Sequence, residues 1–261
     1  MNNVITPQWL RAEPELVARF RSAEPFPHVV LDNFLEPEFV WRLYEEFPSV
    51  EAMPKSRDYM FGNKHELSSV EANGPASAAF YERIMSAEFR LFLTKIVGAD
   101  VFVDPAFFGG GFHQGGDGSY LDTHVDFNVH PLHGNWLRTL NILLYLNPEW
   151  KAEYGGELLI RSRPEGEPTA IAPLFNRALI MLTDRHTYHG YEKMSLPPGI
   201  TRKSIATYAY QLIADDEMIE RHTTGWAPEN AGLGKRLIAR HYDTLVRVKN
   251  KYLGSRTARN R

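Results

Sequence analysis

The strongest constraint on the fold lies between residues 101 and 213, where short apolar runs alternate with glycine- and proline-rich turns. The runs cover residues 139–146, 157–160, 178–182 and 204–213. The turn signals lie at residues 109–111, 115–118, 155–156, 164–166 and 197–199. Short strands separated by such turns are typical of an antiparallel sandwich or barrel.

The first hundred residues favour helices. Residues 26–34 hold a short β-branched run and predict one strand. Pro37 suits the first turn of a helix that Pro48 ends, and residues 76–97 form a second amphipathic stretch. Because helices precede strands, we expect them to pack against one face of a sheet. The predicted fold class is mostly β with flanking helices.

The length of 261 residues suits one sizeable domain. We expect residues 1–261 to form this single domain in three parts. These are an N-terminal helical support over about 1–100, a strand-rich core over about 101–215, and a helical basic tail over about 216–261.

Composition excludes several classes of protein. The chain has no cysteine, which removes disulfides, thiolate metal sites and cysteine nucleophiles together. The first residues lack the apolar segment of a secretory signal, and no run of about eighteen apolar residues predicts a membrane span. We expect a cytoplasmic protein that does not bind membranes.

The C-terminal segment is basic. A helix is predicted over residues 233–253, and the chain from Lys235 onward holds nine Lys/Arg residues and one acidic residue, Asp243. Such a patch suits RNA or an acidic partner, but charge runs of this kind usually form a solvated surface. With a net charge of −3 for the whole chain, we do not expect a nucleic-acid partner.

One set of residues carries chemistry. His124 and Asp126 lie two positions apart in a predicted strand, where alternate side chains share a face and reach the same ion. His189 follows the apolar run at residues 178–182. Two imidazoles and one carboxylate, with open positions opposite, form the facial triad of non-haem iron(II) oxygenases. The three residues are the predicted metal ligands and catalytic centre.

Arg202 and Ser204 strengthen this interpretation. Both lie at the start of the last strand-like run and share one face of it. A guanidinium binds a carboxylate through two parallel hydrogen bonds, and the serine hydroxyl adds a third. The pair predicts a receptor for the distal carboxylate of 2-oxoglutarate.

At this point the sequence resembles the prolyl 4-hydroxylase-like 2-oxoglutarate/Fe(II)-dependent dioxygenases. The resemblance runs from about Phe26 to Ile213 and is carried by four pieces in order. They are His124-Val125-Asp126, Tyr145-Leu146-Asn147-Pro148-Glu149-Trp150 leading to Gly155-Gly156-Glu157-Leu158, His189-Gly190, and Arg202-Lys203-Ser204.

The resemblance implies a double-stranded β-helix (jelly-roll) core with supporting helices. It implies that Fe(II), 2-oxoglutarate and O2 are used, with ascorbate as a supporting reductant. It also places the Tyr145 hydroxyl beside Arg202 and Ser204 at the co-substrate. Related halogenases have a small residue at the position of Asp126, so a carboxylate there favours hydroxylation.

Two features depart from the family pattern or compete with it. Relatives often carry a tyrosine where this chain reads Phe112-His113-Gln114, and His113 and Gln114 are both candidates for that polar role. His186 lies three residues before His189, but His189 precedes a glycine as the family pattern requires.

The loop of residues 128–136 is expected to border the open face of the iron. The candidates for substrate contact are therefore Asn128, His130, Trp136 and Arg138. The alternative for this segment is a polar loop with one anchoring tryptophan.

The predicted reaction is hydroxylation of an unactivated C–H bond, coupled to decarboxylation of 2-oxoglutarate to succinate. The substrate is a prolyl or other amino-acid residue, or a small molecule derived from an amino acid. The alternatives are a zinc-dependent hydrolase, which has no evident general base here, and a non-catalytic jelly-roll metal-binding sensor. Monomer and homodimer both stay open.

Overall fold

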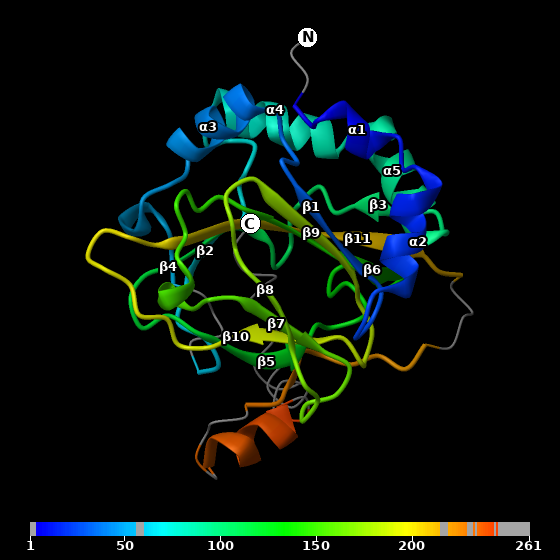
Figure 1. The fold of residues 1–261 in the computed structure, drawn as a ribbon. Helices are drawn as coiled ribbons and strands as arrows, with labels where there is room; N and C mark the ends of the chain where they lie inside the picture. The colour runs from blue at the N-terminus through cyan, green and yellow to red at the C-terminus, as the bar shows by residue number, and fades with distance from the viewer. Residues whose placement is uncertain are drawn as a thin grey trace.

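The computed structural model describes residues 4–55, 60–214, 219–228, 232, 234–242 and 244. In this part of the chain, two antiparallel sheets face each other and five helices cover one of them (Figure 1). The arrangement confirms the predicted mostly β jelly-roll with flanking helices. No helix among these residues has the length and apolarity needed to cross a membrane.

The larger sheet has the strand order β1-β9-β6-β11-β4-β2, with β3 paired to β11. Its strands are β1 (His28–Asp32), β2 (His65–Leu67), β3 (Phe102–Val103), β4 (Gly111–Gly115), β6 (Trp136–Tyr145), β9 (Arg177–Leu182) and β11 (Arg202–Leu212). The smaller sheet has the order β12-β5-β10-β7-β8. Its strands are β5 (Leu121–Val125), β7 (Leu158–Arg161), β8 (Thr169–Ile171), β10 (Tyr188–Tyr191) and β12 (Gly225–Trp226).

Both faces of the larger sheet are buried, which explains its continuous apolar runs. On β6, Leu140, Ile142 and Leu144 pack into the core beneath the helices. Leu143 and Tyr145 point to the other side, into a second core shared with Leu158 and Ile160 of the smaller sheet. Period-two alternation thus separates a structural face from a face that lines the interior of the jelly roll.

The helices lie on the outer face of the larger sheet (Figure 1). They are α1 (Pro7–Leu10), α2 (Pro14–Ser22), α3 (Pro37–Glu45), α4 (Pro75–Ile84) and α5 (Ala87–Val97), with short 3-10 turns at Val50–Ala52 and Ala152–Tyr154. The first four begin with proline, whose fixed φ suits a first turn. The amphipathic stretch at residues 76–97 forms two helices, because Ser86 caps the start of α5 through a hydrogen bond from the Phe89 amide.

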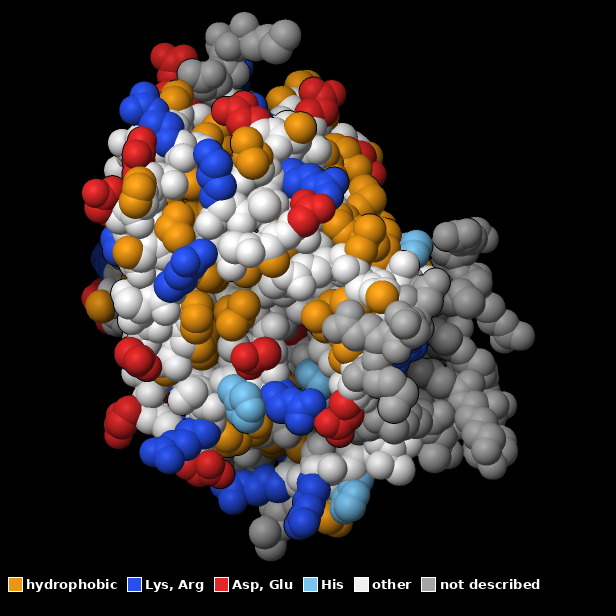
Figure 2. Space-filling view, turned by 90° about the vertical axis from the view of Figure 1, so that its right-hand side faces the viewer, with side chains coloured by type: hydrophobic (Ala, Val, Ile, Leu, Met, Phe, Trp, Pro, Cys, Tyr) orange, Lys and Arg blue, Asp and Glu red, His pale blue; other side chains and the backbone are white. Residues whose placement is uncertain are grey.

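A short helix of residues 234–242 lies beneath the smaller sheet, away from α1 to α5 (Figure 1). The helix predicted over residues 233–253 is therefore present in its first part. Residues 216–218, 229–231, 233, 243 and 245–261 of the predicted basic tail lie outside the described residues. On the face drawn in Figure 2, acidic and basic side chains alternate and do not gather into a patch of one sign.

Candidate active site

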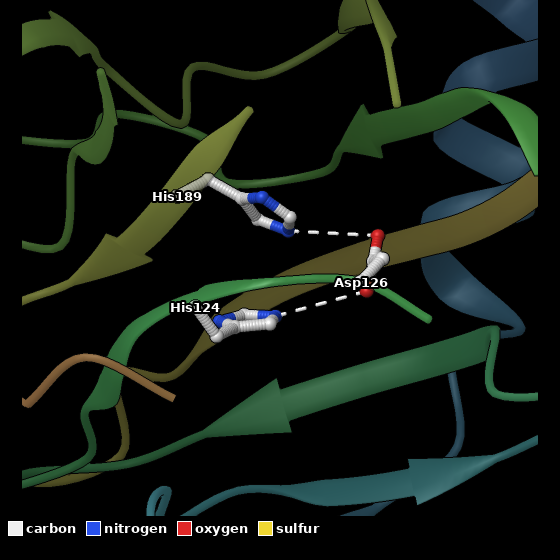
Figure 3. A group of neighbouring side chains, drawn as sticks. All are labelled: His124, Asp126 and His189. Carbon is white, nitrogen blue, oxygen red and sulfur yellow. Dashed lines mark ion pairs between the residues drawn. The ribbon is translucent and has the colours of Figure 1, made fainter. Parts of the chain in front are cut away.

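His124, Asp126 and His189 come together between the two sheets. His124 on β5 pairs directly with His189 on β10, so their imidazoles lie side by side with ring centres 4.3 Å apart. Asp126 follows β5 and faces both rings (Figure 3). His124 Nε2 is 3.8 Å from Asp126 Oδ1, and His189 Nε2 is 3.8 Å from Asp126 Oδ2. One ligand atom from each of the three lies within 4.8 Å of the others, which fits a single metal ion.

Hydrogen bonds orient both imidazoles for metal binding. His124 Nδ1 lies 2.9 Å from the Asp122 carbonyl, and His189 Nδ1 lies 3.1 Å from the Thr187 carbonyl. A carbonyl only accepts, so each Nδ1 carries the proton and each Nε2 presents its lone pair to the interior. Burial, with the neighbouring His189, lowers the pKa of His124 to about 3. This imidazole is therefore a neutral ligand at physiological pH.

Asp126 is buried, yet it is ionised. Burial raises the pKa of its carboxyl group, but the positive charge of Arg138, with the neighbouring His189 and His124, outweighs burial and lowers the pKa to about 2. Arg138 Nη1 lies 3.2 Å from Asp126 Oδ1, and Asn141 Nδ2 donates to Asp126 Oδ2 at 3.2 Å. An anionic oxygen ligand and two imidazole nitrogen ligands fit a divalent iron that keeps open positions.

A cavity beside the triad is lined by residues of the larger sheet. Ser204 pairs with Tyr145 on one neighbouring strand and with His113 on the other, so the three form a row across β6, β11 and β4. Arg202 lies on the same face of β11, and its Nε donates to the Gly156 carbonyl at 2.8 Å. Its guanidinium lies 4.3 Å from the centre of the Tyr191 ring. These contacts hold the cation buried at one end of the cavity.

Four buried polar atoms of this cavity lack a hydrogen-bond partner of normal geometry among the described residues. Two are acceptors, Gln114 Oε1 and Asn141 Oδ1, and two are donors, the Tyr145 hydroxyl and His113 Nε2. Lys64 Nζ donates to His113 Nδ1 at 3.4 Å, which leaves the proton of the neutral ring on Nε2. Burial, together with the charge of Lys64, lowers the pKa of His113 to about 3. Because buried polar groups are normally paired, the two donors fit an anionic ligand such as a carboxylate.

The competing histidine, His186, is exposed and lies outside this cluster. Its backbone amide donates to Asp184 Oδ1 at 2.6 Å in a tight turn before β10. The structure thus places His189, and not His186, beside His124 and Asp126.

The residues predicted to contact the substrate all have partners within the protein. The Asn128 amide group bonds the backbone of Glu220 and His222. His130 is buried, with its Nε2 3.5 Å from Asp104 Oδ2, and Trp136 stacks on His133. The fourth, Arg138, is buried against Asp126. Their role in substrate binding stays a prediction.

Two residues at the site were not predicted from the sequence. Asn141 is the one amide side chain in the apolar run of residues 139–146, and that break in polarity was a usable signal. Trp226 covers His124, with ring centres 4.7 Å apart, because β12 pairs with β5. Nothing in the sequence around Trp226 predicts that it lies at the site.

Comparison with known proteins gives a family match over the core of the chain. The model of the 2OG-Fe(II) oxygenase superfamily matches residues 110–210, a segment that contains all three triad residues and Arg202. The match covers the strand-rich core of the chain, which is similar there to the 2OG-Fe(II) oxygenases. Such an oxygenase uses Fe(II), 2-oxoglutarate and O2, and the donor set and the unpaired donors of the cavity fit the first two.

Solved structures of prolyl hydroxylases show the same fold. A Pseudomonas putida prolyl-4-hydroxylase aligns with a TM-score of 0.56 at 15% identity, covering 76% of this chain and 100% of its own. A Trichoplax adhaerens prolyl hydroxylase in complex with a hypoxia inducible factor peptide aligns with a TM-score of 0.53 at 15% identity, covering 78% and 91%. A comparison with curated protein sequences finds no match to this oxygenase.

Proposed function

We propose that this oxygenase hydroxylates an unactivated C–H bond of a prolyl or other amino-acid residue, or of a small molecule derived from an amino acid. The observation that carries the proposal is one cavity that joins a buried His-Asp-His cluster to a buried arginine. When bound, iron and 2-oxoglutarate supply the oxidising chemistry, in which O2 is consumed and succinate and CO2 are released.

In this proposal, His124, Asp126 and His189 bind Fe(II) through Nε2, one carboxylate oxygen and Nε2. Carbonyl acceptors at Nδ1 keep both imidazoles in the required tautomer. Three protein ligands on one side leave room on the other for the oxo-acid and for O2. A carboxylate at position 126 fills the place that a halide needs, which favours hydroxylation over halogenation.

Arg202 is the proposed receptor for the distal carboxylate of 2-oxoglutarate. Its Nε is already bound to the Gly156 carbonyl, so the outer edge of the guanidinium is left for the carboxylate. The Tyr145 hydroxyl and the Ser204 hydroxyl stand in the adjacent row and add further donors. The His113 Nε2–H faces the same cavity and supplies the polar contact for which relatives often use tyrosine.

The zinc hydrolase alternative is weaker. Hydrolysis at a metal-bound water needs a general base close to that water. Among the described residues that line the cavity there is no aspartate or glutamate. The nearby Asp126 is itself a proposed metal ligand and is paired with Arg138. The cavity also holds a buried arginine, which a hydrolase mechanism does not require.

The substrate class rests on likeness to prolyl hydroxylases, one of which was solved with a peptide. We keep Asn128, His130, Trp136 and Arg138 as the proposed substrate side of the site. Of these, Asn128 and Trp136 are partly exposed and are the two that a substrate reaches without rearrangement.

An anaerobic titration of the purified apoprotein with Fe(II) and then 2-oxoglutarate tests the proposal. We expect the weak visible charge-transfer band of an iron–oxo-acid chelate, lost in His124→Ala and retained in His186→Ala. Succinate release in air then reports turnover during a substrate search. Iron binding without the band removes 2-oxoglutarate from this site and favours a metal-binding sensor.

A further inference from the structure

Arg138 occupies an unusual position for an arginine. It is 2% exposed, and its guanidinium is sandwiched between the rings of Phe127 and Tyr208, 3.6 and 3.5 Å from their centres. Stacking on two aromatic faces fixes the plane of the guanidinium and replaces part of its lost hydration. The side chain is thereby held in one orientation inside the jelly roll.

A break in strand register turns Arg138 toward the metal cluster. On β6, Leu140 pairs with Ala209 of β11, but the next pair joins Arg138 to Tyr210, so Thr139 has no opposite partner. An extra residue of this kind reverses the alternation of side chains. Without it, Arg138 would share the helix-facing side of Leu140; with it, Arg138 lies on the same side as Asn141.

The edge of the guanidinium is bound to the triad. Arg138 Nη1 lies 3.2 Å from Asp126 Oδ1, and Nη2 donates to the Tyr210 hydroxyl at 3.2 Å. The opposite carboxylate oxygen accepts from Asn141 Nδ2. Both oxygens of the Asp126 carboxylate are therefore bound by side chains outside the triad. Each oxygen also lies 3.8 Å from the Nε2 of one imidazole.

We propose that Arg138 is a positioning residue that locks the Asp126 carboxylate so that only one of its oxygens binds the metal. A carboxylate without this lock can rotate and bind through both oxygens, which would fill a position that the co-substrate or O2 needs. This inference rests on the proposed role of the triad. It gives Arg138 a task beside the metal in addition to the proposed substrate contact.

Co(II) binding to the apoprotein, followed by its visible spectrum, tests the lock without turnover. Arg138→Met keeps the bulk of the side chain and removes its charge. Arg138→Lys keeps the charge and removes the planar guanidinium with its paired N–H donors. Tyr210→Phe removes the hydroxyl that accepts a hydrogen bond from Arg138 Nη2. Partners of metal ligands contribute roughly 10–100-fold to affinity. We expect Co(II) affinity to fall about tenfold or more in Arg138→Met, less in Arg138→Lys, and a few-fold in Tyr210→Phe, each with an altered spectrum.

The matched control is Arg177→Met, which removes another arginine–aspartate pair of the larger sheet, 2.6 Å from Asp32, without touching the triad. It should bind Co(II) as the wild type does. If Arg138→Met does not fold, the other two variants decide, since both keep the buried positive charge. Unchanged or tighter Co(II) binding with an unchanged spectrum in Arg138→Lys and Tyr210→Phe overturns the lock. Failure of the wild type to bind Co(II) through His124 and His189 would instead overturn the proposed metal site.

Discussion

At the scale of single residues, the choice between two nearby histidines is the sharpest prediction. His189→Ala removes a buried imidazole whose Nε2 faces Asp126, whereas His186→Ala removes an exposed side chain. We expect His189→Ala to weaken Fe(II) binding by more than the roughly 10–100-fold lost with an outer partner of a ligand. An anaerobic titration of both variants checks this, and equal losses would show that the wrong histidine was assigned.

Arg202 carries a separate prediction, because it is proposed to bind the co-substrate and not the metal. Arg202→Ala removes a charge-assisted double hydrogen bond, so 2-oxoglutarate affinity should fall on the order of 10–100-fold. Fe(II) affinity should stay at the wild-type value. Lys203→Ala is the neighbouring control, since Lys203 lies on the other face of β11 near Tyr44. A 2-oxoglutarate titration that does not distinguish the two variants contradicts the assignment.

The buried neutral His124 makes the stability of the apoprotein depend on pH. Its pKa is lowered to about 3, so between the ordinary value of 6.5 and about 3 the unfolded chain binds a proton that the native chain does not. Stability is therefore complete above pH 6.5 and is lost as pH falls, by about 1.4 kcal/mol per pH unit for this group. Denaturant unfolding at pH 7 and pH 5 should show a smaller loss in His124→Asn than in the wild type. His186→Asn should retain the wild-type loss.

At the scale of elements, β12 matters more than its length suggests. Trp226 is buried between His124 and Phe61, and its ring stacks on Phe61 with centres 4.5 Å apart. Trp226→Ala should destabilise the protein by about 3–5 kcal/mol and also weaken metal binding, because His124 loses its cover. Trp41→Ala, at a side chain that is 47% exposed and packs on Phe175 far from the triad, should destabilise the protein less and leave metal binding unchanged. Thermal unfolding with and without Co(II) separates the two effects.

The elements that the sequence predicted correctly are those with a strong local pattern. Strands β6, β9 and β11 follow from long apolar runs, and α3 follows from proline at both ends. The short strands β2, β4 and β12 carry no such pattern, because each holds a single apolar residue beside polar or glycine residues and pairs only once a partner strand is present. Their existence is a consequence of tertiary structure.

At the scale of the whole molecule, the site was predictable where its members form a pattern along the chain. His124 and Asp126 share a strand face, as do Arg202 and Ser204, and the order of the motifs added His189 and Tyr145. Contacts between distant segments were not predictable, such as Lys64 with His113 and Trp226 with His124. The place of Arg138 also required the structure, since an unpaired Thr139 reverses the side on which simple alternation puts it.

The two edges of the smaller sheet differ in what they touch. β8 forms one edge and pairs with β7, away from the metal ligands, whereas β12 forms the other edge and places Trp226 on His124. Backbone amides at sheet edges exchange with solvent deuterium through local fraying. A metal that immobilises His124 should therefore slow exchange at Gly225 and Trp226 and leave β8 unaffected. Occupancy of the iron site would then be readable from the protection of a two-residue strand that lies about a hundred residues further along the chain from His124.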